Sequence, residues 1–81
     1  MFFRKAVSQD RVAVGRSFFR RLNNRAVETA EVLGIASDGF GIPHVRYELT
    51  VEHTQSHAVY PAGTKVLSLA TFNETYPQSV A

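Results

Sequence analysis

Two histidines have the spacing that comes nearest to a metal site. His53 and His57 form an H-x-x-x-H pattern, which on a helix would place both imidazoles on one face as zinc ligands. The residues between them are polar and typical of a loop, and no Glu follows the first histidine. His44 and Glu52 would have to complete the set, but on one extended strand they are roughly 27 Å apart. We therefore expect no metal site.

No other set of residues indicates catalysis. The chain contains no cysteine, and none of its serines lies in a G-x-S-x-G motif. Glu48 and Glu52 would lie on one face of a strand, about 14 Å apart, in a setting that leaves both ionised. A chain of 81 residues with one shallow sheet also has little volume for a typical ligand pocket. We expect a non-enzymatic protein without a cofactor.

An aromatic residue lies between two glycines in the segment Asp38-Gly39-Phe40-Gly41-Ile42-Pro43. The segment lacks the G-x-x-x-x-G-K-[ST] spacing of a phosphate-binding loop, and a strand pattern follows it where that loop would need a helix. It therefore predicts a hairpin turn. Phe40 would lie at the tip of this turn, where it either folds over the end of the core or anchors a partner.

Charge is distributed unevenly along the chain. Residues 1–25 contain seven Lys or Arg and one Asp, a local charge of +6, and phenylalanines are interleaved with these cations. Residues 26–81 contain two Lys or Arg and six Asp or Glu, a local charge of −4. The basic segment is typical of contacts with nucleic-acid phosphates or with an acidic protein, and peripheral contact with an anionic membrane is a lesser alternative. A solvated helix face would explain the same charges without any partner.

The basic segment predicts an amphipathic helix over about residues 8–23. At 100° per residue, five apolar side chains form one stripe: Phe3, Val7, Val14, Phe18 and Leu22. Lys5, Arg16 and Arg20 lie on the opposite side of this helix. These three cations and Phe40 are the predicted binding residues. Gly15 would cost the helix about 1 kcal/mol relative to Ala, and residues 11–14 also fit the start of a strand.

From Ala26 onward the apolar residues recur with a period of two, which is typical of strands. The clearest strand covers residues 44–52. Its alternation predicts one buried set, Val45, Tyr47, Leu49 and Val51, and one exposed set, His44, Arg46, Glu48 and Glu52. Further strands are predicted over about residues 27–36 and 64–72, with turns at 38–43 and 60–63.

These patterns together predict an α+β fold in a single small domain. The basic helix of residues 1–25 would pack on an antiparallel sheet of about three strands in residues 26–76, and residues 77–81 would fray. The turns and short strands of residues 27–72 also loosely resemble, in architecture, the small SH3-like barrels used as nucleic-acid or protein adaptors.

The predicted function is a small non-enzymatic interaction domain, with nucleic acid slightly ahead of protein as the partner of the basic helix. The alternative is a structural or oligomerising module whose helix belongs to the core. Exposed sheet edges predict a homodimer, paired through an edge or through the apolar stripes of the helices. The chain shows neither a signal peptide nor an apolar stretch near the roughly 20 residues of a membrane span, so we expect a cytoplasmic location.

Overall fold

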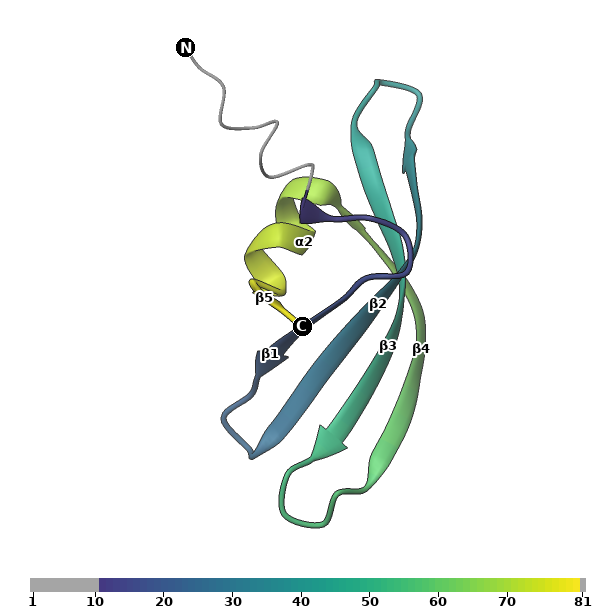
Figure 1. The fold of residues 1–81 in the computed structure, drawn as a ribbon. Helices are drawn as coiled ribbons and strands as arrows, with labels where there is room; N and C mark the ends of the chain where they lie inside the picture. The colour runs from purple at the N-terminus through teal and green to yellow at the C-terminus, as the bar shows by residue number, and fades with distance from the viewer. Residues whose placement is uncertain (1–10, 81) are drawn as a thin grey trace.

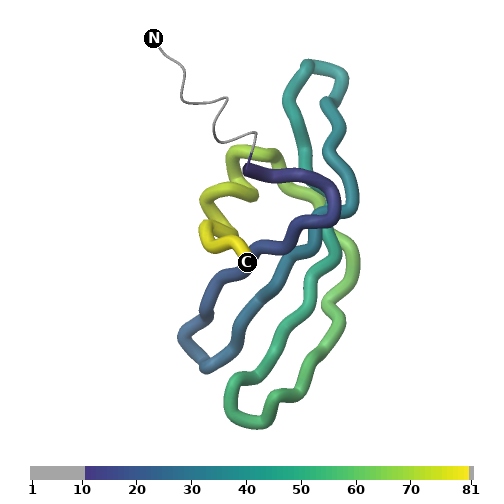
Figure 2. Tube along the Cα trace, in the orientation of Figure 1, coloured from purple at the N-terminus to yellow at the C-terminus, as the bar shows by residue number. Residues whose placement is uncertain are grey.

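The computed structural model describes residues 11–80, which form a mostly antiparallel sheet with one short helix (Figure 1). The elements in chain order are β1 (Ser17–Arg21), β2 (Ala26–Ser37), β3 (Pro43–His53), β4 (Val59–Ser68), α2 (Leu69–Thr75) and β5 (Gln78–Ser79). The spatial order of the strands is β4-β3-β2-β1-β5. The chain thus runs through a four-stranded meander and returns through α2, so that its last strand lies beside its first (Figure 2).

The predicted helix over residues 8–23 is wrong from Val12 onward, and with it the α+β fold class. Residues 17–21 form β1, and Gly15, at a φ of 91°, belongs to a turn just before that strand. The error has a geometric cause. Val14, Phe18 and Leu22 are four residues apart, which suits one face of a helix and equally one face of a strand, because four is a multiple of two. Phe3 and Val7 lie outside the described residues.

The described sheet is open. It begins with β4 and ends with β5, and no pairing joins these two strands within residues 11–80. A closed small barrel of the SH3-like kind is therefore not formed by this part of the chain.

The register predicted for β3 is confirmed by its buried set, although His44, Glu48 and Glu52 of the predicted exposed set are half-buried. Val45, Tyr47 and Leu49 are 0%, 4% and 7% exposed, and Arg46 between them is exposed. Val51 is half-buried, because it lies further along the strand and beyond the compact part of the core. The strand expected over residues 27–36 is also confirmed, as β2.

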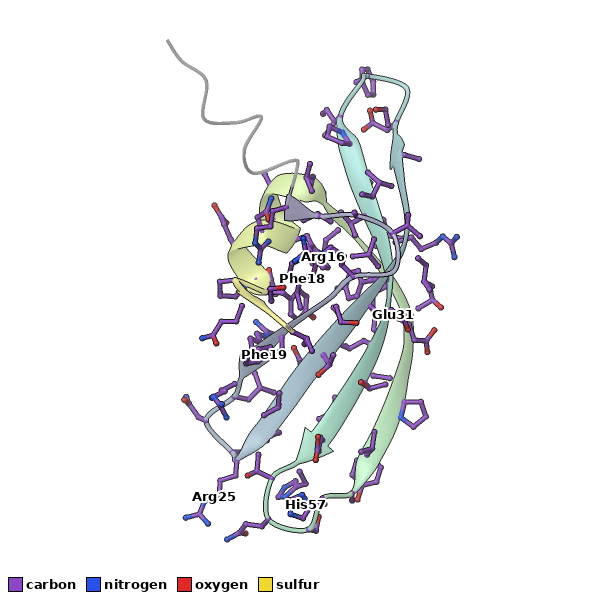
Figure 3. All side chains as sticks on the ribbon, in the orientation of Figure 1. Arg16, Phe18, Phe19, Arg25, Glu31 and His57 are labelled. Atoms are coloured by element: carbon purple, nitrogen blue, oxygen red, sulfur yellow. The ribbon has the colours of Figure 1, made fainter. Side chains whose placement is uncertain are left out.

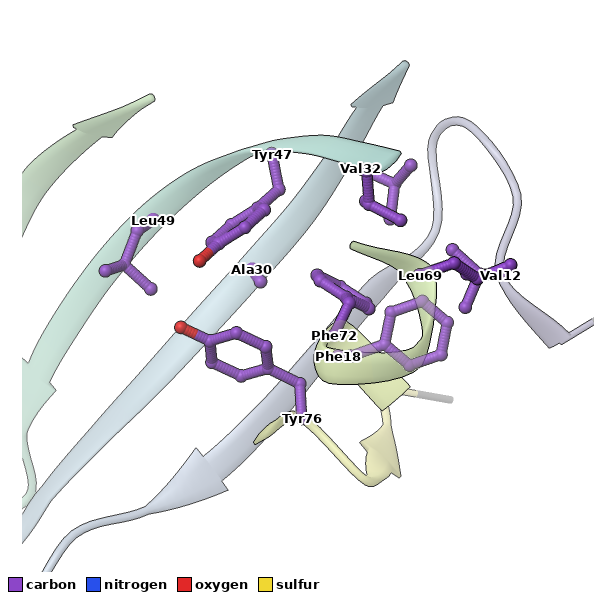
Figure 4. Close-up of a cluster of buried hydrophobic side chains, with 10 residues drawn as sticks. Val12, Phe18, Ala30, Val32, Tyr47, Leu49, Leu69, Phe72 and Tyr76 are labelled. Atoms are coloured by element: carbon purple, nitrogen blue, oxygen red, sulfur yellow. The ribbon is translucent and has the colours of Figure 1, made fainter. Parts of the chain in front are cut away.

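The helix α2 lies where the third predicted strand was expected to end. Ser68 caps its N-terminus and accepts a hydrogen bond from the backbone N–H of Thr71 at 3.2 Å. Beyond this cap, Leu69, Phe72 and Tyr76 are spaced three and four residues apart, so they share one side of the helical segment and pack on the sheet (Figure 4). The predicted strand over residues 64–72 is therefore wrong in its second half. Among residues 11–80, no helix is long and apolar enough to cross a bilayer.

An aromatic cluster forms the centre of the core. Phe72 of α2 meets Phe18 of β1 edge-to-face, with ring centroids 5.6 Å apart, and meets Tyr47 of β3 at 5.2 Å. Tyr76 completes the cluster, 5.5 Å from Tyr47. Such edge-to-face pairs add a favourable quadrupole interaction to the burial of their area.

The predicted fraying of residues 77–81 is wrong for the residues of β5. Gln78 and Ser79 pair with Phe19 and Phe18 of β1, and the N–H of Val80 donates to the carbonyl of Ser17 at 2.9 Å. The C-terminal segment therefore extends the sheet.

Candidate functional site

Arg20, one of the predicted binding residues, is engaged inside the fold. It lies on β1 directly opposite Glu28 of β2, and its Nε is 2.7 Å from the Glu28 Oε1. The guanidinium also lies 5.4 Å from the centre of the Tyr76 ring. The hydrogen bond to Glu28 is the main cause that raises the pKa of Arg20 above its usual value. Arg20 therefore ties β1 to β2 and to the end of α2.

Arg16, the second predicted binding residue, contacts the C-terminal strand. Its Nη2 donates to the Ser79 hydroxyl at 3.1 Å, and its guanidinium lies 5.6 Å from the Phe18 ring, as the stick view indicates (Figure 3). Arg11 lies over the same ring at 4.4 Å and donates to the Asn73 side chain and to the Tyr76 carbonyl. Burial, and then the nearby charge of Arg16, lower the pKa of Arg11.

Arg16 and Arg20 do not share the helix face that the sequence predicted. Arg16 precedes β1 and Arg20 lies on it, and both contact other parts of the fold. Lys5 lies outside the described residues. The basic amphipathic helix that was to present Arg16 and Arg20 is absent from residues 12–23, where a turn and then β1 take its place.

The histidines and carboxylates form pairs but no larger cluster. His57 Nδ1 is 3.6 Å from Glu52, and His44 Nδ1 is 3.9 Å from Asp38. Within residues 11–80, no three His, Cys, Asp or Glu side chains come close enough together to hold a metal ion.

Phe40 lies at the tip of the β2–β3 hairpin, and it is 90% exposed. Of the two positions that the sequence left open, folding over the core is therefore wrong. The Asp38 carboxylate holds the turn, because its Oδ1 accepts hydrogen bonds from the N–H groups of Phe40 at 2.8 Å and Ile42 at 3.0 Å. These two bonds, with Ile42 contributing most, lower the pKa of Asp38. The turn thus presents Phe40 to solvent on an ordered backbone.

Two further exposed apolar side chains lie on this hairpin, Ile42 next to the tip and Ile35 further along β2, and neither was predicted from the sequence. Ile42 is 49% exposed and Ile35 is 40% exposed. They reach solvent because the hairpin projects beyond its neighbours: β1 pairs with β2 only as far as Glu31, and β4 pairs with β3 only from His44 (Figure 1). The exposure of Ile42 could have been predicted from its position directly before Pro43, since a turn residue next to a proline has little reason to be buried.

A groove lies at the base of the same hairpin. It has a volume of about 330 Å³ and is lined by Gly34, Ile35, Ala36, His44, Arg46 and Val66. Gly34 follows a break in the β2–β3 register, and the Arg46 guanidinium lies over it, 3.5 Å from where a Cβ would be. The groove is therefore mainly apolar, with one arginine across it.

Comparison of the chain with protein-family models, curated proteins and solved structures found no match.

Proposed function

We propose that this chain is a small non-enzymatic domain that binds a partner protein through the tip of its β2–β3 hairpin, with Phe40 as the anchor. The observation that carries the proposal is the 90% exposure of Phe40 on a turn fixed by two hydrogen bonds to Asp38. Buried aromatic anchors supply much of the binding energy at protein interfaces. A turn that is already ordered loses less conformational entropy on binding.

The charge of the tip favours a protein over a phosphate-bearing partner. Residues 37–42 contain Asp38 and no Lys or Arg, so the tip repels nucleic-acid phosphates and anionic lipid head groups. Arg16 and Arg20, which would have attracted phosphates, make hydrogen bonds within the fold. The partner that fits the tip is a protein with an apolar pocket and positive charge at its rim.

Site-specific photo-crosslinking, carried out in the cells that express the protein, tests this proposal. A benzophenone amino acid replaces Phe40 in one protein and Gln55 in a matched control, because Gln55 is exposed in the β3–β4 loop at the opposite end of the sheet. We expect discrete cross-linked protein species from position 40 and none from position 55. Identical patterns from the two positions would contradict the proposal.

Nucleic acid and membranes are tested on the purified protein. We expect neither salt-sensitive binding to DNA or RNA at about 50 mM salt nor flotation with anionic vesicles. If the protein binds DNA or RNA, the binding weakens steeply with salt and Phe40→Asp abolishes it, then the partner of the tip is a nucleic acid and not a protein. If the protein floats with anionic vesicles and Phe40→Asp abolishes the flotation, then the tip binds a membrane and not a protein.

A further inference from the structure

The β2–β3 hairpin carries both an apolar projection and an apolar groove. Phe40 lies six residues after Gly34 and six before Arg46, and the latter two are cross-strand partners in the groove. Since a strand advances about 3.3 Å per residue, tip and groove are at most about 20 Å apart along one hairpin.

We infer that the partner of the tip is a second copy of this chain. Two hairpins cross about a two-fold axis, and Phe40 of each copy enters the groove lined by Gly34, Arg46 and Val66 of the other. The inference rests on the proposed function, because it uses the same anchor and names its partner. The resulting contact is a closed dimer, since a projection and its groove on one patch are self-complementary, as a two-fold interface requires.

The charges of tip and groove are complementary. Arg46 is exposed, and no carboxylate within residues 11–80 lies within 4.0 Å of its guanidinium. Asp38, two residues before Phe40, uses Oδ1 in the turn, while its Oδ2 is 3.9 Å from His44. When Phe40 enters the groove of another copy, the Asp38 carboxylate comes near Arg46 of that copy. An arginine across the groove also suits an aromatic ring as a cation–π partner.

The sheet edges are poorly suited to the homodimer that the sequence predicted for them. In the edge strand β4, Pro61 has no N–H to donate, and the register breaks beside it at Ala62. Gly63 at a φ of 88° and the charge of Lys65 interrupt the edge further. The other edge, β5, is two residues long. The exposed apolar hairpin is thus better suited to pairing than either edge of the described sheet.

The contact is small, so the dimer should be weak. A stable interface buries about 800 Å² per partner, and a hairpin tip with one groove provides less. We expect a dissociation constant of about 10–500 µM, and hence a mass that depends on concentration over the range tested.

Sedimentation and light scattering from about 1 to 500 µM test the inference. The wild-type protein should move from its 9.0 kDa monomer toward twice that mass. Phe40→Asp and Val66→Asp should each raise the dissociation constant about tenfold or more, because each removes one side of both contacts. Both side chains are exposed, so the thermal melts should stay unchanged. The exposed control Gln55→Asp should leave dimerisation unchanged.

Mixing the two variants separates reciprocal exchange from any other dimer. Phe40→Asp keeps its groove and Val66→Asp keeps its tip, so the mixture regains one of the two contacts that each variant alone has lost. We expect a heterodimer of intermediate strength in the mixture. A wild-type protein that stays at 9.0 kDa to 500 µM, or a mixture that stays monomeric, would overturn the inference. Cross-links from position 40 to other proteins would then still support the proposed function.

Discussion

Arg20 and Glu28 are register partners on β1 and β2 and form an ion pair. The Glu28 carboxylate also accepts a hydrogen bond from the Tyr76 hydroxyl. The Glu28 Oε1 lies 2.7 Å from the Arg20 Nε and 3.4 Å from the Tyr76 hydroxyl. The Glu28 side chain is 15% exposed and that of Arg20 is 40% exposed. One carboxylate thus joins two neighbouring strands to the segment that follows α2.

A double-mutant cycle measures this tie. Because Arg20 is partly solvated, we expect a coupling free energy of about 0.5–1.5 kcal/mol between Arg20→Gln and Glu28→Gln in urea unfolding. The exposed control Arg25→Gln should change the unfolding free energy by less than about 0.5 kcal/mol. Strict additivity of the Arg20 and Glu28 variants would show that the pair contributes nothing.

Substitutions at Leu49 and Phe40 distinguish a core residue from a residue of the proposed interaction site. Leu49 is 7% exposed, so Leu49→Ala should lower the unfolding free energy by about 2–5 kcal/mol. Phe40 is 90% exposed, and Phe40→Ala should change it by less than about 0.5 kcal/mol at concentrations where the chain is monomeric. A large loss of stability in Phe40→Ala would mean that this side chain packs on the core after all.

Tyr76 makes stability fall at high pH. Burial is the main cause that raises the pKa of its phenol, and the nearby Tyr47 and Glu28 add to it. A raised pKa in the folded state gives stability that is complete below the unfolded pKa of about 10 and is lost as the pH rises above it. Ultraviolet titration should show Tyr76 ionising only as the protein unfolds. In Tyr76→Phe, the alkaline loss of stability should become shallower.

Asp38 makes the hairpin tip sensitive to acid. Its pKa is lowered by the N–H groups of Ile42 and Phe40, so the ionised carboxylate orders the turn above the usual pKa of about 4. That order is lost as the pH falls through the lowered value. In an NMR titration, the amide signals of Phe40 and Ile42 should shift with a midpoint below about 4. Asp38→Asn keeps the acceptor oxygen and loses the charge, so its amide signals should not titrate.

The strands from Ala26 to His53 could be predicted from the sequence because their pattern had one interpretation. Val45, Tyr47 and Leu49 alternate with charged residues, and no helix places such a set on one face. The turn at Asp38-Gly39 was equally clear, since Asp and Gly favour it through local chemistry.

The predictions for the two ends of the chain were wrong because the apolar patterns there fit two kinds of secondary structure. The four-residue spacing of Val14, Phe18 and Leu22 suits a helix and a strand alike, and long-range pairing with β2 and β5 decided between them. The N-cap Ser68 and the spacing of Leu69 and Phe72 did signal a helix, but the preceding strand pattern extended over them.

The candidate site was only partly accessible to the same reasoning. Phe40 stood out because an aromatic residue between two glycines has no local role in a turn. The groove could not be predicted, since Gly34, Arg46 and Val66 come together only through pairing of three strands. The charge count alone also suggested that Arg16 and Arg20 were available to a binding partner. Their hydrogen bonds to Ser79 and Glu28 are apparent only from the fold.

The pairing of β5 with β1 has a consequence for the order in which the molecule folds. The β2–β3 and β3–β4 hairpins join near neighbours in the chain, whereas the bond from Arg11 to the Tyr76 carbonyl spans 65 residues. Closing a longer loop costs more chain entropy, so the hairpins should form first and the two ends should close over them last. Since β1 also forms a short hairpin with β2, the late element is β5, and in native-state hydrogen exchange its amides should open well before those of β3.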